Sequence, residues 1–200
     1  NLVNPSATNQ PAYNASDSDF NNLPSFTFDG TSDYLINNVS DYRISDNSGM
    51  MVCVIKRGGA DISPILSFGA GAGTTRMSLR TTTSGGLQFV KLGGAGGTRI
   101  NTTTTTANNS QTYVLVIAST GSAYKMFIDS GSESFSGTDD GLWLSSYPAG
   151  NLNNISVGAS VSGSINYADA KVAMTGYFPY VDDATALNLI SFLKTKYGIS

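Results

Sequence analysis

The residues of this 200-residue chain that could do chemistry gather in one short stretch. Asp139 and Asp140 precede Trp143, the only tryptophan, and Tyr147 follows it. Sugar-binding sites combine an aromatic face with carboxylate or amide groups that hydrogen-bond the sugar hydroxyls. The stretch therefore predicts a carbohydrate-binding loop made by these four residues. The alternative is that Trp143 fills the core or an interface, because a large aromatic side chain contributes most through packing.

Asp139 and Asp140 could also supply oxygen ligands to calcium, which takes about six to eight oxygens and often uses backbone carbonyls. The chain has no D-x-[DN]-x-[DN]-G loop, so the alternative is a polar turn. For Asp29, Asp33 and Asp46 we favour turn formation over metal binding. No cofactor other than calcium is expected.

The composition excludes most catalytic machinery. The chain has no histidine, which removes the Ser-His-Asp triad, a histidine general base and imidazole metal ligands. Glu133 is the only glutamate, so a glutamate pair for glycoside hydrolysis cannot form. We therefore predict no catalytic residues and a protein that is not an enzyme.

Charge and hydropathy limit the partners. The 11 Lys and Arg are scattered and the net charge is −3, which does not favour nucleic acid as a partner. The longest apolar run, 50–55, is far shorter than the ~20 residues of a membrane span, so we expect no membrane insertion. Cys53 is the only cysteine and excludes an internal disulfide; a buried hydrophobic role is favoured over a reactive thiol.

Most of the elements that must position these residues are predicted to be short strands. Residues 24–28 alternate, 49–57 form a continuous apolar run typical of a strand covered on both faces, and 113–118 and 124–129 flank a hairpin turn at 119–122. Strands that recur at about ten-residue spacing without intervening helices indicate a sandwich.

One helix is predicted at the C-terminal end of the chain. Asp182 or Asp183 can cap its first turn, and the apolar stripe includes Leu187, Ile190 and Tyr197. Gly198 is placed to end it, because a helix often terminates in a left-handed residue.

Several segments resemble laminin-G-like domains of the concanavalin-A-like fold. Residues 28–35, FDGTSDYL, are similar to the signature FDG-[ST]-x-D-Y-L of these domains, and 154–158, NISVG, to an I-x-I-G strand. The closing segment, LKTKYGI at 193–199, is similar to the family ending L-x-x-K-Y-G-I. The ordered series covers most of residues 10–199. The resemblance implies an all-β fold, a two-sheet antiparallel jelly-roll sandwich with one C-terminal helix.

The resemblance also implies a domain organisation and a setting. Residues 1–22 are expected to form an extended N-terminal segment, and 23–200 the laminin-G-like domain. An earlier strand of the family has no counterpart here, so we expect the N-terminal segment or a neighbouring subunit to cover an open sheet edge. Concanavalin-A-like hydrolases carry E-x-D-x-x-E, which is absent around Glu133. Similar domains occur in phage virion and tail proteins and in secreted bacterial proteins, which implies a virion-surface or extracellular location.

Together these expectations define a leading function and its alternatives. We predict a non-catalytic virion-surface or tail-fibre domain that binds host-surface glycans. The alternatives are a carbohydrate-binding or adhesin module of a secreted bacterial protein, and a pure assembly or decoration module. The expected partners are a cell-surface glycan or a neighbouring virion protein, in a homo-oligomer or a larger assembly.

Overall fold

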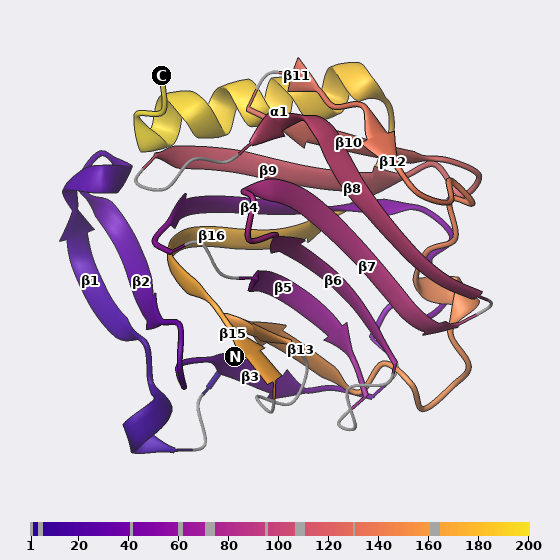
Figure 1. The fold of residues 1–200 in the computed structure, drawn as a ribbon, viewed down its shortest axis with the longest axis horizontal. Helices are drawn as coiled ribbons and strands as arrows, with labels where there is room; N and C mark the ends of the chain where they lie inside the picture. Colours follow the sequence, from indigo (N-terminus) through magenta and orange to yellow (C-terminus); the bar gives the residue numbers. More distant parts are fainter. Residues whose placement is uncertain are drawn as a thin grey trace.

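A computed structural model gives the fold (Figure 1) and describes residues 2–3, 6–40, 42–59, 62–70, 75–94, 96–106, 111–129, 131–160 and 165–200. These residues form two seven-stranded sheets, one two-stranded sheet and a single α-helix near the C-terminal end, and the strands pair antiparallel. The predicted fold, an antiparallel sandwich with one C-terminal helix, is confirmed.

The helix-side sheet is the seven-stranded sheet that the α-helix covers. Its strands, in spatial order, are β1 (Ala12–Asp17), β2 (Leu23–Asp29), β16 (Asp169–Phe178), β4 (Gly49–Arg57), β9 (Thr112–Ser119), β10 (Tyr124–Ile128) and β11 (Gly131–Ser132). The opposite sheet has the order β12 (Phe135–Ser136), β8 (Gly96–Thr106), β7 (Gly86–Gly94), β6 (Arg76–Thr81), β5 (Ser63–Gly69), β13 (Asn154–Val157) and β3 (Leu35–Asn38). The two-stranded sheet pairs β14 (Ala159–Ser160) with β15 (Ile165–Tyr167), and three short 3-10 helices are η1 (Ala7–Asn9), η2 (Ser18–Phe20) and η3 (Leu144–Ser146).

Strand β4 shows why its sequence is apolar throughout. Met51, Cys53 and Ile55 face the core between the sheets, whereas Val52 and Val54 face the helix side. All five side chains are fully buried, as the continuous apolar run predicts. The predicted hairpin is also confirmed, because β9 and β10 pair in register from Ser119 and Tyr124.

Helix α1 (Asp183–Tyr197) lies across the outer face of the helix-side sheet, at the top of Figure 1. Asp182 caps it by accepting a hydrogen bond from the Thr185 backbone N–H at 2.6 Å, and Gly198 ends it in the left-handed conformation. Ile190, Leu193 and Tyr197 are buried against the sheet. Among the described residues, no helix has the length and apolar character needed to cross a membrane.

The N-terminal segment contributes the edge strand β1, which pairs with β2 at the left of Figure 1. Lys171 of β16 contacts both Asp17 (3.2 Å) and Asp19 (2.7 Å), and Lys56 of β4 contacts Asp19 at 2.7 Å. These ion pairs tie the segment to the sheet surface. Further upstream, Val3 forms two backbone hydrogen bonds with Ile36 of β3, at 2.9 and 2.8 Å, so the chain also touches the edge of the opposite sheet.

Candidate functional site

The two aromatic residues of the predicted sugar-binding loop are buried. Trp143 is 1% exposed and stacks on Phe89 of β7, with ring centroids 5.8 Å apart and planes at 21°. Tyr147 is 4% exposed, and its hydroxyl donates to the Arg76 carbonyl at 2.7 Å. Neither ring presents a face to solvent, so the structure corrects the predicted stacking role. Trp143 is a core residue, which was the alternative interpretation, because its large apolar ring packs between the sheets.

The two carboxylates of that loop hold it against β10. Asp139 accepts a hydrogen bond from the Tyr124 backbone N–H at 2.5 Å, and Asp140 accepts from the Tyr124 hydroxyl at 2.9 Å and the Leu142 N–H at 3.0 Å. Burial, followed by the contact with Asp140, raises the pKa of Tyr124. Within the described residues no group of three His, Cys, Asp or Glu could hold a metal ion. In the structure Asp139 and Asp140 anchor this turn to β10 through these hydrogen bonds.

An accessible cavity lies elsewhere, between β3, β5 and β13 of the opposite sheet and β16 of the helix-side sheet. We call it the mouth pocket. Its volume is about 280 Å³, and its lining residues are Leu2, Asn37, Tyr42, Leu66, Phe68, Ile155, Thr175, Gly176 and Tyr177. Strands β3 and β13, below the centre of Figure 1, form one wall. Ligand pockets commonly span roughly 300–1,000 Å³, so this volume suits one small group and not an extended chain.

Strand register explains why these residues meet. Asn37 of β3, Ile155 of β13 and Phe68 of β5 are direct cross-strand partners, so their side chains lie in one row on the inner face of the opposite sheet. Facing them from β16, Thr175 and Tyr177 pair with Cys53 and Met51, whose side chains also face the core. Two inward rows, one from each sheet, therefore form the walls of the mouth pocket.

Aromatic rings form the side of the mouth pocket nearest the 42–46 turn. Tyr42 stacks on Phe68 with centroids 5.5 Å apart and planes at 12°, and Tyr177 meets both rings edge-on at 6.3 and 6.1 Å. Behind Tyr177, the ring of Trp143 lies 6.4 Å away. A continuous cluster of rings thus runs from the core to the pocket.

The Tyr177 hydroxyl is held by its neighbours and is not available to a ligand. It accepts from Trp143 Nε1 at 2.7 Å and donates to Asp46 Oδ2 at 3.0 Å. Asp46 in turn pairs with Arg43, whose guanidinium lies 4.6 Å above the Tyr177 ring. A side chain at Gly49 would overlap the Tyr177 hydroxyl and the Trp143 indole, so glycine is required there. Burial raises the pKa of Tyr177, which stays protonated.

Three other polar groups of the mouth pocket have no such partner. Among the described residues, the side-chain amide of Asn37 and the hydroxyls of Tyr42 and Thr175 make no hydrogen bond within the chain. All three residues are partly exposed, so water can satisfy them when the pocket is empty. A few polar groups that converge on an otherwise apolar cavity are typical of a ligand site.

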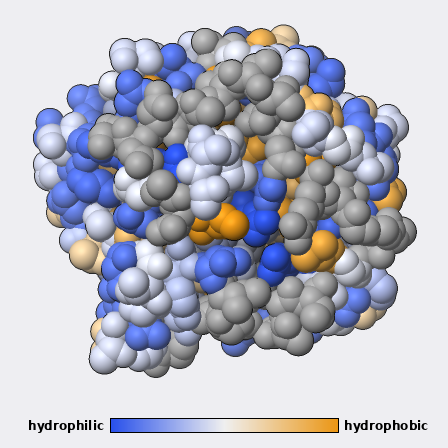
Figure 2. Space-filling model, viewed as in Figure 1, coloured by the Kyte–Doolittle hydropathy of each residue, from blue (hydrophilic) through white to orange (hydrophobic). Residues whose placement is uncertain are grey.

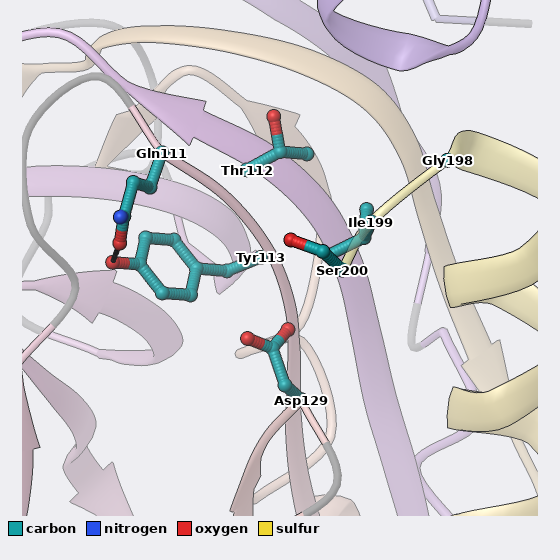
Figure 3. A pocket seen from close by; sticks show the side chains of 7 residues that line it. All are labelled: Gln111, Thr112, Tyr113, Asp129, Gly198, Ile199 and Ser200. Carbon is teal, nitrogen blue, oxygen red and sulfur yellow. Dashed lines mark hydrogen bonds between the residues drawn. The ribbon is translucent and has the colours of Figure 1, made fainter.

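A second cavity, drawn in Figure 3, offers less to a ligand. It measures about 240 Å³ and lies between Gln111–Tyr113, Asp129 and the end of the chain. Two of its polar side chains already have partners: the Tyr113 hydroxyl donates to Gln111 at 2.8 Å, as Figure 3 shows, and Asp129 accepts from the Val114 N–H at 2.9 Å. Burial raises the pKa of Asp129. We therefore take the mouth pocket as the candidate site.

The outer surface gives no comparable apolar site in the view of Figure 2. Among the coloured residues of this face, hydrophilic ones cover more area than hydrophobic ones, which form small separate areas. Surface patches that bind partners through apolar contact are usually larger and contiguous. The coloured part of this face therefore does not compete with the mouth pocket as an apolar binding site.

Comparisons with known proteins find the fold in sialidases. No family model and no curated protein sequence matches the chain. The CBM40 carbohydrate-binding module of the Ruminococcus gnavus IT-sialidase superposes with a TM-score of 0.67 at 12% identity, over 83% of this chain and 96% of that one. The same module bound to α2,3-sialyllactose gives a TM-score of 0.63 at 14% identity, over 82% and 96% of the two chains.

A larger protein matches over part of its length. A Trypanosoma rangeli sialidase mutant that displays trans-sialidase activity has a TM-score of 0.64 at 12% identity, and the match covers 94% of this chain and 30% of that one. At such identities the similarity establishes the fold: this chain has the β-sandwich architecture found in sialidase carbohydrate-binding modules.

Proposed function

We propose that this domain is a carbohydrate-binding module that takes one sugar residue of a glycan into the mouth pocket. The observation that carries the proposal is the combination of two tyrosine rings with three unpartnered polar groups, on Asn37, Tyr42 and Thr175, in one accessible cavity. Aromatic packing against the sugar is kept from the sequence prediction, but an amide and two hydroxyls take the part that the prediction gave to the carboxylates of Asp139 and Asp140. The place of the site in the fold moves from the Trp143 loop to the mouth pocket.

The rings and the polar groups have complementary tasks in this proposal. A sugar ring carries C–H groups that can pack on the surfaces of Tyr42 and Tyr177, and such packing is favourable because it removes apolar area from water. Its hydroxyls both donate and accept, which matches an amide and two hydroxyls that do the same. The small volume favours a terminal residue over an internal segment of a polysaccharide.

Binding without turnover is part of the proposal. Among the described residues that line the mouth pocket none carries a carboxylate, and the nearby Asp46 is already engaged by Tyr177 and Arg43. Glycoside hydrolysis in most families needs two suitably spaced carboxyl groups. The similarity to CBM40 modules, one of them bound to α2,3-sialyllactose, supports a glycan as the ligand class.

The setting of the module is also a proposal. We favour a module of a secreted protein over a phage tail-fibre domain, since the structural similarities are to sialidase modules. The virion surface is the alternative location. Assembly is a second candidate function, because β1 lies at a sheet edge and Tyr13 on it is 61% exposed.

A glycan array followed by titration calorimetry tests the proposal. Wild-type chain should bind at least one glycan, and Tyr42→Ala should weaken binding at least about tenfold, because it removes a ring wall and a hydroxyl. Tyr13→Ala is the matched control, since this exposed tyrosine packs on Phe26, lies on the edge strand β1 and does not line the mouth pocket. Absence of binding on the array, or wild-type affinity in Tyr42→Ala, would contradict the proposal.

A further inference from the structure

Part of the lining of the mouth pocket, which we call its floor, is apolar and offers no hydrogen-bond partner to the hydroxyls of a simple hexose. Leu66 and Phe68 are only 3% and 2% exposed, and Ile155 and Leu2 complete the apolar lining. A sugar hydroxyl pressed against these side chains would lose its hydrogen bonds to water and gain none. The group that enters deepest should therefore end in an apolar atom, such as a methyl group.

Asn37, which carries a side-chain amide, is a cross-strand neighbour of one residue of this apolar floor. Asn37 and Ile155 are cross-strand partners on the same face, so their Cβ atoms lie within about 5.5 Å. A side-chain amide carries two N–H donors and an oxygen acceptor, and it can pair with another amide through one donor and one acceptor on each side. The arrangement pairs one amide with a neighbouring apolar hollow.

We infer that the mouth pocket selects an acetamido sugar. The methyl of its N-acetyl group packs against Leu66, Phe68 and Ile155, and its amide exchanges hydrogen bonds with Asn37. The hydroxyls of Tyr42 and Thr175 then serve the sugar hydroxyls. This inference rests on the proposed glycan-binding function and names the ligand class of the same site.

Calorimetry with matched sugar pairs tests the inference. The pairs differ by the acetamido group: methyl glycosides of N-acetylglucosamine and glucose, methyl glycosides of N-acetylgalactosamine and galactose, and N-acetylneuraminic acid and its deaminated analogue KDN. In at least one pair, wild-type chain should prefer the acetamido member by at least about tenfold. Asn37→Leu should reduce that preference to within about threefold, because the new side chain cannot pair with an amide.

Asn38→Leu is the matched control. It makes the same change one residue along β3, at an exposed position whose side chain points to the other face of the sheet. It should keep the preference for the acetamido member. Circular dichroism and thermal melting of both variants establish that they are folded.

The outcomes separate this inference from the proposed function. Binding of glycans on the array with equal affinity for both members of every pair would overturn the acetamido inference and leave glycan binding standing. Absence of binding to any glycan would overturn the proposed function itself. A folded Asn37→Leu variant that keeps the full preference would overturn the role of Asn37.

Discussion

Trp143 supports the mouth pocket from behind and does not line it. Its ring is buried against Phe89, and its indole N–H holds the hydroxyl of Tyr177, which lines the mouth pocket. Residue types in the 139–147 stretch predict sugar chemistry, but they do not say whether the aromatic side chain points outward or inward. The burial of Trp143 was the open alternative, and tertiary packing decided it.

Two substitutions at Trp143 separate packing from positioning. Trp143→Ala should destabilise the domain by about 3–5 kcal/mol in urea unfolding, because it leaves a large cavity in the core. Trp143→Phe keeps a ring but removes the donor to Tyr177, so it should cost about 1–3 kcal/mol and weaken glycan binding several-fold. A folded Trp143→Phe variant with wild-type glycan affinity would show that the indole N–H does not position Tyr177 for the ligand.

At the scale of elements, the turn that follows β2 explains the FDG signature. The Asp29 carboxylate accepts hydrogen bonds from the backbone N–H groups of Thr31, Ser32 and Asp33 and from the hydroxyls of Thr31 and Ser32, at 2.6 to 3.0 Å. Gly30 adopts a φ of +75° beside Asp169, a conformation that favours glycine. Turn formation, the favoured interpretation of Asp29, is confirmed.

This turn makes a prediction about acid stability. Burial alone would raise the pKa of Asp29, but the hydrogen bonds from Thr31, Ser32 and Asp33 hold it far below its usual value. A depressed pKa stabilises the fold above the unfolded-state pKa of about 3.9, and this stabilisation is lost as the pH falls below it. Asp33 acts in the opposite sense, since burial and then Asp29 raise its pKa.

Urea unfolding between pH 6 and pH 2 measures the effect. Wild-type stability should fall as the pH drops below about 4, and Asp29→Asn should be less stable at pH 6 and lose less between pH 4 and pH 2. The control is Asp183→Asn, which removes a half-exposed carboxylate from the first turn of α1 and leaves the Asp29 turn intact. Equal acid sensitivity in Asp29→Asn and wild type would contradict the assignment to Asp29.

The elements that could be predicted are those whose determining residues lie close together in the sequence. The helix over residues 183–197 follows from its Asp182 cap, its apolar stripe and Gly198, all of which lie next to one another in the sequence. Strand β4 follows from its unbroken apolar run. Tyr42 and Tyr177 could not be recognised as a pair in this way, because they lie far apart in the sequence, one in a polar turn and the other in strand β16.

At the scale of the whole molecule, the mouth pocket depends on topology. Its residues come from positions 2, 37, 42, 66, 68, 155 and 175–177, and they meet because β5, β13 and β3 are neighbours in one sheet and β16 faces them from the other. No spacing in the sequence records these distances. A strand order must be known before such a site can be recognised, which is why the sequence supported the sugar-binding chemistry but not its location.

The most direct test of the account locates the bound glycan. Isotope-labelled chain is titrated with the glycan that the array selects, and backbone amide chemical shifts are followed by NMR. The account predicts that the largest changes gather at Asn37, Tyr42, Ile155 and Thr175–Tyr177, which line the mouth pocket. Changes that gather instead around Asp139–Tyr147 or around Gln111–Tyr113 and Asp129, with the mouth pocket unaffected, would contradict it.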